Sequence, residues 1–230
     1  EMLWIYQAQS NDVRWLQERD VKIWDQWEID ENGYWNATQL LPDENGNLVK
    51  QQVHKFFGKE FAHTIGTAYG YIVKKFRMTQ ELIDKIQHHP EDRRMVMTLW
   101  QNDYLDTAVL PSCVWSSEWD VTNGKLNCWV HQRSCDVPLG LPFNVTQYAV
   151  LLCMLAHVSG LKPGTIDWSI KDAHIYVNQA DGIREQLRRF KENGDLPAPE
   201  LWLNPQVKDF FAFDNSRDIK DIKLVNYQHM

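Results

Sequence analysis

The stretch Gln132-Arg-Ser-Cys-Asp-Val-Pro-Leu-Gly-Leu-Pro-Phe-Asn144 says more about the fold and chemistry of this chain than any other segment. Together with Cys113 upstream, it supplies a thiol, a guanidinium group, a carboxylate and a carboxamide within residues 113–144. A thiolate attacks an electron-poor carbon far better than a hydroxyl group does, and a neighbouring cation lowers the pKa of a thiol. Few chemistries need this set of groups.

Length and composition limit the possible classes of protein. The chain has 230 residues, 43% of them hydrophobic, and a formal net charge of −7. We expect one domain, residues 1–230, with a sizeable core. The acidic balance argues against general nucleic-acid binding, although a few Arg side chains can hold a mononucleotide. No apolar run approaches the ~18 residues of a membrane span, so we expect no membrane partner.

The cysteines, histidines and tryptophans narrow the chemistry further. The four cysteines form no C-x-x-C pair, which indicates reduced thiols in a cytoplasmic protein. The eight histidines show no ligand spacing, so we predict no metal. Most of the eleven Trp residues are expected to pack in the core. Trp24 and Trp27 form either a stacking wall for a flat ligand or one face of a packed helix.

The first half of the chain predicts helices, a loop and the start of a sheet. Residues 1–20 look helical, with Asn11 as an N-cap, and residues 30–50 read as a loop or a small insertion. Thr79 is expected to cap a helix that ends at Pro90. Arg94 to Trp100 alternates like a strand.

The second half predicts a hairpin and a mixed succession of elements. Trp115–Val121 and Leu126–Arg133 read as strands joined by an Asn-Gly turn. A helix is expected over Val145–Val158, before Gly160. The remaining predictions are a strand around Ile166–Ile170, a helix around Ile183–Phe190, and strands at Leu201–Leu203 and Ile222–Tyr227. This order favours an α+β fold.

Several side chains fit a nucleotide site, and each also has a structural explanation. Cys113 is a nucleophile or a small buried hydrophobe. Arg133, at a strand end, grips a phosphate or is solvated. Arg93 and Arg94 form a second pair of cations or are ordinary surface charge. Asn144 matches the O4 and N3–H edge of uracil, or caps the helix starting at Val145. His174 and Tyr176, two residues apart on an expected strand, reach a ribose hydroxyl or form a polar pair. Together they indicate covalent activation of a pyrimidine nucleotide.

In chain order these motifs resemble the thymidylate synthase family along nearly the whole chain. The matching segments are residues 1–5, 23–27, 68–70, 92–94, 110–113, 132–136, 139–144, 172–176 and 227–229. Residues 23–27 and 200–205 look closest to a branch found in some Gram-positive bacteria and their phages. The resemblance implies mixed β-sheets packed with helices, and a sheet face that forms a homodimer interface.

The resemblance also implies an activity and its residues. The activity is reductive methylation of deoxyuridylate (dUMP) to dTMP, with 5,10-methylenetetrahydrofolate as co-substrate and no metal. Cys113 would add to C6 of dUMP, Asn144 would stabilise charge at O4, and Glu1 and Tyr69 would serve proton-transfer waters. The implied catalytic set is Cys113, Glu1, Tyr69, Asn144, Asp136 and Arg133.

Binding residues follow from the same resemblance. Arg93 and Arg94 would reach the phosphate in the other subunit. The implied dUMP-binding set is Arg93, Arg94, Arg133, Ser134, Asp136, Asn144, His174 and Tyr176. The implied folate-binding set is Ile23, Trp24, Trp27, Asp136, Leu139, Gly140 and Phe143.

The chain departs from the family pattern at defined positions. Val114 stands where most members have His, Ser112 where Pro is usual, and Lys171 where members have Gly. We also expect the family's N-terminal segment and C-terminal tail to be lacking, with poor activity as the result. The alternatives are a phage-type dUMP hydroxymethylase on the same fold and a catalytically impaired nucleotide-binding relative.

Overall fold

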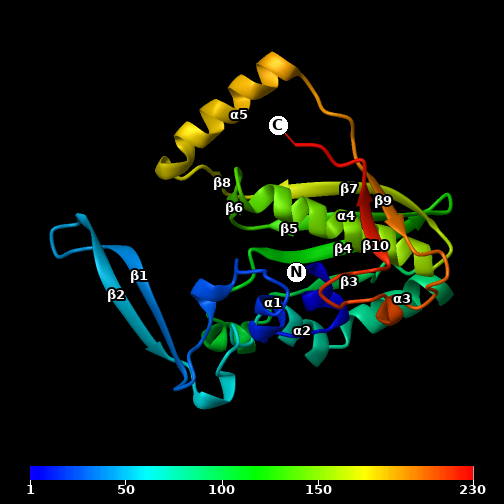
Figure 1. Cartoon of the computed structure of the whole chain (residues 1–230). Helices are drawn as coiled ribbons and strands as arrows, with labels where there is room; N and C mark the ends of the chain where they lie inside the picture. Colours follow the sequence, from blue (N-terminus) through cyan, green and yellow to red (C-terminus); the bar gives the residue numbers. More distant parts are fainter. Residues whose placement is uncertain (230) are drawn as a thin grey trace. The chain divides into compact units, whose positions relative to one another are not determined.

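The computed structural model describes residues 1–229 (Figure 1). The contacts among these residues divide the chain into two units. The first unit holds residues 1, 3–78 and 99–112. The second unit holds residues 2 and 79–98 and the described residues from 113 onward. Both contain helices and strands, so the α+β prediction is confirmed.

The first unit combines short helices with one long hairpin. Its hairpin strands pair antiparallel over their whole length. Its helical elements are η1 (Leu3–Gln7), α1 (Arg14–Gln17), η2 (Asp25–Trp27), η3 (Lys59–Phe61), α2 (Gly70–Lys75) and η4 (Asn102–Thr107), and its strands are β1 (Tyr34–Pro42) and β2 (Leu48–Phe56). Trp4, Leu16, Ile65 and Ile72 are fully buried and form part of its core.

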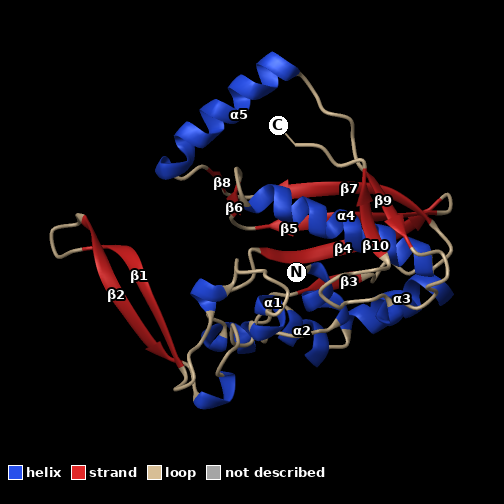
Figure 2. Ribbon diagram, in the orientation of Figure 1, coloured by secondary structure: helices blue, strands red, loops and turns tan. Residues whose placement is uncertain are grey.

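The second unit is built on a four-stranded sheet in the order β3-β4-β5-β7. Strands β3 (Val96–Thr98), β4 (Val114–Thr122) and β5 (Lys125–Gln132) are antiparallel neighbours. Helix α4 (Gly140–Val158) crosses over to β7 (Lys162–Ile170), which runs parallel to β5. Figure 2 shows α4 lying along one face of this sheet, where Cys128 and Val130 are buried.

Smaller elements complete the second unit. A short parallel pair of strands positions the residues that follow β5 and β7. The remaining elements are α3 (Met78–His88), β6 (Cys135–Asp136), β8 (Ala173–His174), η5 (Val177–Gln179), α5 (Ala180–Asn193), β9 (Glu200–Leu203), η6 (Phe210–Ala212) and β10 (Ile222–Val225).

The predicted sheet is confirmed in its main features. Met95 and Met97 are buried while Val96 is 51% exposed, as the alternation predicts. Asn123 and Gly124 have φ values of 51° and 71°, the backbone that a two-residue hairpin turn requires. Gly160 (φ 67°) follows the last turn of α4 and ends it as expected.

The sequence predicts a loop or a small insertion over residues 30–50; the loop is wrong, because most of the segment lies in the β1–β2 hairpin, and the insertion stays a prediction. The polar clusters form only the ends of that hairpin. Asp30 accepts from the main-chain N–H groups of Asn32 and Tyr34, and Asp43 accepts from those of Asn45 and Asn47. These side chains stabilise tight turns, while the intervening segments have enough strand-forming residues to pair.

Three predicted helix caps are also wrong. Asn11 donates to the carbonyl of Gly66, and Asp12 accepts from the N–H of Arg14 instead. Thr79 is buried within α3. Asn144 lies in the first turns of α4, which begins at Gly140. The helix can start there although Pro142 follows, because the N–H groups of a first turn need no helical acceptor.

Helix α4 is long and apolar enough to cross a membrane by length and composition alone. The core helix of a folded domain passes the same test. In this chain α4 packs against β5 and β7, and its buried residues include Leu151, Met154 and Leu155.

Candidate active site

The candidate nucleophile and its cation lie side by side where β4 begins and β5 ends, at the open end of this hairpin. Val114 pairs with Gln132 in the antiparallel register, so Cys113 and Arg133 are the next residues outward. The main-chain N–H of Arg133 donates to the carbonyl of Cys113 at 2.9 Å. The side chains also meet, because Arg133 Nη2 lies 3.9 Å from Cys113 Sγ. The structure therefore brings the predicted thiol and guanidinium together.

Asn144 is tied to the same strand end through Gln132. The Nε2 of Gln132 donates to Asn144 Oδ1 at 3.2 Å and to the carbonyl of Ser134 at 2.9 Å. Its Oε1 accepts from Trp168 Nε1 at 3.0 Å, and Gln132 itself is only 3% exposed. These bonds leave the Nδ2 of Asn144 as the group it can offer to a ligand.

Asp136, His174 and Tyr176 gather at the pairing of β6 with β8. Asp136 lies opposite His174 in this parallel register. The rings of His174 and Tyr176 pack edge to face, with centroids 4.9 Å apart. The His174 Nδ1 lies 3.5 Å from Asp172 Oδ2 but is buried without a hydrogen bond among the described residues. A buried ring nitrogen of this kind fits a hydroxyl-bearing ligand.

The expectation that His174 and Tyr176 share a strand is corrected in part. Strand β8 ends at His174, and Tyr176 is the residue before η5. Their side chains still lie together because the chain continues in extended form at Tyr176 (φ −72°, ψ 145°).

An apolar pair lies beside Asp136 at the start of α4. Leu139 is 58% exposed and Phe143 is 54% exposed. They are one helical turn apart, so both side chains cover the same strip of surface. Gly140 lies between them, and a Cβ there would come within 3.3 Å of the Asp136 Cβ. The arrangement gives a carboxylate bordered by apolar surface, which suits a flat polar ring.

A second group of predicted residues lies within the first unit. The Trp24 Nε1 donates to Glu1 Oε1 at 2.8 Å, and the Trp24 ring meets the Tyr69 ring edge to face at 5.2 Å. Tyr69 has a φ of 47° and a ψ of −107°, which is rare for a residue with a Cβ. Strain of this kind is often found at functional sites.

Trp24 and Trp27 do not share one packed helix face. Trp27 ends the short η2 and stacks on Trp35, with centroids 5.5 Å apart and an interplanar angle of 12°. Trp24 precedes η2 and is buried against Trp4 and Tyr69. Ile23, next to it, is 46% exposed.

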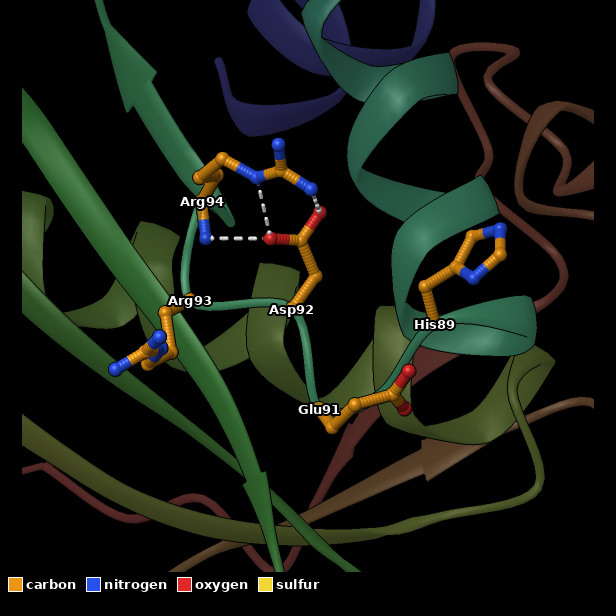
Figure 3. Close-up of a pocket in the computed structure, with 5 residues that line it drawn as sticks. All are labelled: His89, Glu91, Asp92, Arg93 and Arg94. Carbon is orange, nitrogen blue, oxygen red and sulfur yellow. Dashed lines mark hydrogen bonds and ion pairs between the residues drawn. The ribbon is translucent and has the colours of Figure 1, made fainter.

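Arg93 and Arg94 border an open hollow of about 570 Å³ (Figure 3). Arg94 binds Asp92 through its main-chain N–H at 2.9 Å, its Nε at 2.8 Å and its Nη2 at 3.2 Å. These bonds from Arg94 lower the pKa of Asp92 from 3.8 to about 2. Arg93 turns the other way in Figure 3. The pair is at the surface, as both the phosphate and the surface-charge interpretations require.

The four cysteines differ in their surroundings. Cys113 is half-buried, and all four are free thiols. Burial raises the pKa of Cys128 and Cys153, and burial with the charges of Asp136 and Cys113 raises that of Cys135. Across residues 1–229 no cluster of three or more His, Cys, Asp or Glu is arranged to hold a metal.

The candidate set omitted two residues that the structure brings into the site. Gln132 was noted only as part of the motif, and Trp168 only as a strand residue, yet they position Asn144 together. The signal was present in the alternation of β5, which places Gln132 on the buried face with Val130. A buried amide needs partners.

Comparison with known proteins decides the family. The family model described as Thymidylate synthase matches residues 1–230. The chain belongs to the thymidylate synthase family. It is 44% identical to a thymidylate synthase of Clostridium beijerinckii over 229 residues, covering 100% of this chain and 73% of that protein. A Bacillus atrophaeus thymidylate synthase is 37% identical over 238 residues, with 100% of this chain and 88% of that protein covered.

A solved structure agrees with this assignment. The thermostable thymidylate synthase A from Bacillus subtilis matches with a TM-score of 0.77 and 37% identity, covering 99% of this chain and 71% of that one. As a thymidylate synthase the chain is a methyltransferase that forms dTMP from dUMP. Nothing in these matches supports the hydroxymethylase or the impaired relative.

Proposed function

We propose that the chain methylates dUMP with Cys113 as the nucleophile that adds to C6 of the pyrimidine. The observation that carries this assignment is the contact between Arg133 and Cys113. A half-buried thiolate needs a nearby cation, and the guanidinium supplies one. Arg133 has further N–H groups with which to bind the phosphate of dUMP, together with Ser134.

Asn144 reads the base in this proposal. Its Oδ1 is engaged by Gln132, so the Nδ2 donates to O4 of uracil and stabilises the charge that develops there. The amino group of cytosine would meet a second donor at this position and be rejected. His174 and Tyr176 bind the 3′-hydroxyl of the ribose.

The residues assigned to the reduced folate fit a flat, polar ring system. Asp136 can accept from ring N–H groups, while Leu139, Gly140 and Phe143 offer apolar contacts. Ile23, Trp24 and Trp27 are assigned to the same ligand. Bound 5,10-methylenetetrahydrofolate supplies the one-carbon unit and the hydride. Glu1 and Tyr69 order the waters that carry protons to and from the pyrimidine.

We further propose that the protein works as a homodimer through the sheet face opposite α4. Trp115 and Trp129 are 38% and 49% exposed there, with His131 between their rings. An exposed aromatic sheet face of this kind is typical of an interface. Arg93 and Arg94 are assigned to the phosphate in the partner subunit.

The remaining assignments are proposals supported by composition. We place residues 1–230 in one catalytic domain in the cytoplasm, with no metal, no membrane and no general nucleic-acid partner. The free thiols of all four cysteines fit a reducing compartment. The net charge of −7 disfavours polyanions.

The assay that tests this function follows dihydrofolate formation from dUMP and methylenetetrahydrofolate by absorbance. We expect turnover with the wild type, none with Cys113→Ser, and unchanged turnover with Cys153→Ser, which changes another half-buried thiol, as the control. A hydroxymethylated product without dihydrofolate would contradict the proposal. Product mass distinguishes the two reactions.

A further inference from the structure

Gln179 carries no assigned role, yet its side chain connects two parts of the site. It ends η5 and precedes α5. Its Oε1 accepts from the main-chain N–H of Tyr176 at 3.0 Å. Its Nε2 donates to Asp136 Oδ2 at 2.9 Å, across 43 residues of sequence. One amide therefore joins the segment assigned to the ribose to the carboxylate assigned to the folate.

The Asp136 carboxylate is oriented by bonds to both of its oxygens. Oδ1 accepts from the main-chain N–H of Leu139 at 3.3 Å, and Oδ2 accepts from Gln179. A Cβ at position 140 would come within 3.3 Å of the Asp136 Cβ, so the glycine leaves room for this side chain. A carboxylate has about four acceptor positions, so the two bonds fix its direction and leave capacity for a ligand.

We propose that Gln179 is a positioning residue that holds Asp136 for the reduced folate and couples folate binding to nucleotide binding. This inference rests on the proposed function and adds a residue to it. A nucleotide that orders His174 and Tyr176 also orders the N–H to which Gln179 is bonded. Asp136 is then already oriented when the folate arrives, so the second ligand binds with a smaller ordering cost.

Two substitutions distinguish the acceptor role of the Gln179 amide from its donor role. Gln179→Glu keeps the acceptor for the Tyr176 N–H, but it loses the donor and places a second carboxylate against Asp136. Gln179→Ala loses both the acceptor and the donor. Gln186→Ala, on the exposed side of α5, is the matched control. Substrate KM values come from the dihydrofolate assay, and dUMP affinity from calorimetry.

The expected result is weaker use of the folate with little change in dUMP binding. Both Gln179 variants raise the KM for methylenetetrahydrofolate about tenfold or more, because a charge-assisted hydrogen bond is lost. In Gln179→Glu, dUMP affinity stays within about twofold. The rise in the folate KM of Gln179→Glu becomes smaller as the pH is lowered from 8 to 5.5, because a protonated Glu regains a donor. In the wild type dUMP strengthens binding of tetrahydrofolate, and this enhancement falls in both variants.

Three outcomes would overturn the inference. The first is a wild-type folate KM in Gln179→Glu. The second is an equal rise in Gln186→Ala. The third is a Gln179→Glu defect in dUMP affinity as large as that in folate KM. Should Gln179→Ala unfold, Gln179→Glu decides alone, since it keeps the bond to Tyr176. An inactive wild type would instead refute the proposed function, and this inference with it.

Discussion

Arg133 Nη2 lies 3.9 Å from Cys113 Sγ, and the main chains of the same two residues are hydrogen-bonded at 2.9 Å. The main-chain bond continues the pairing of β4 with β5, so the sheet itself determines which cation faces the thiol. A guanidinium group at this distance favours the thiolate, and its fork of N–H donors is also the geometry that suits an anion. The chemistry proposed for this chain depends on that pairing.

Removing the cation should damage both nucleophile and phosphate binding. We expect Arg133→Ala to lower kcat/KM for dUMP about 100-fold or more, since hydrogen bonds to charged groups contribute about 1.5–3 kcal/mol each. Arg133→Lys should recover only part of the lost kcat/KM, because an ammonium group cannot bind a phosphate bidentately. Arg188→Ala on α5 removes an exposed Arg as control. Full activity of Arg133→Ala in the steady-state assay would refute this role.

Changing the amide at position 144 should change the preferred base. In Asn144→Asp a carboxylate faces the base, which favours the amino group of cytosine over O4 of uracil. We expect the dUMP:dCMP ratio of kcat/KM to fall about 10- to 100-fold, on the basis of about 1–3 kcal/mol per matched contact. Asn193→Asp at the end of α5 is the control. A ratio that does not move would show that Asn144 does not contact the base.

The thiols should react with an alkylating agent in a defined order. Burial raises the pKa of Cys128, Cys135 and Cys153, so each has less thiolate at a given pH. Half-buried Cys113 should be the first residue carboxamidomethylated by iodoacetamide at pH 8, and dUMP should protect it. Peptide mass spectrometry over a time course gives the order. Faster labelling of Cys153 would contradict the assignment.

The Asp92–Arg94 pair predicts a specific acid titration. Hydrogen bonds from Arg94 lower the pKa of Asp92 to about 2, so the folded state favours the ionised carboxylate. The stabilisation is present above the ordinary pKa of 3.8 and is lost as the pH falls through about 2. Carboxyl carbon NMR should show Asp92 titrating near 2 in the wild type and closer to 3.8 in Arg94→Gln, which loses the guanidinium bonds but keeps the main-chain N–H bond. Identical titration in both proteins would exclude the pair.

The sequence was sufficient where local patterns determine structure. The alternation of Met95, Val96 and Met97 and the Asn-Gly turn at residues 123–124 predicted three sheet strands. It failed at the β1–β2 hairpin, because Gln39, Gln51 and other polar residues interrupt the apolar alternation there. The two strands are neighbours in the chain, and the pairing of one strand with the other, rather than an apolar alternation within either strand, holds that hairpin together.

The residues of the candidate site also fall into those that the sequence predicts and those that only the tertiary structure reveals. Cys113, Arg133 and Asn144 could be named from the sequence because their chemistry is distinctive. Gln132 and Gln179 could not, because an amide acquires a role only from its neighbours. Gln179 meets Asp136 solely because β6 pairs with β8. Positioning residues of this kind depend on the tertiary structure.

The most direct test of the account is the mass of the protein after incubation with 5-fluoro-dUMP and methylenetetrahydrofolate. We predict a covalent ternary adduct whose label maps to the peptide containing Cys113, and no adduct with Cys113→Ser. Fluorine at C5 cannot leave as a proton does, so the complex should persist through denaturation. An unmodified wild-type protein, or a label on Cys135 or Cys153, would contradict the account.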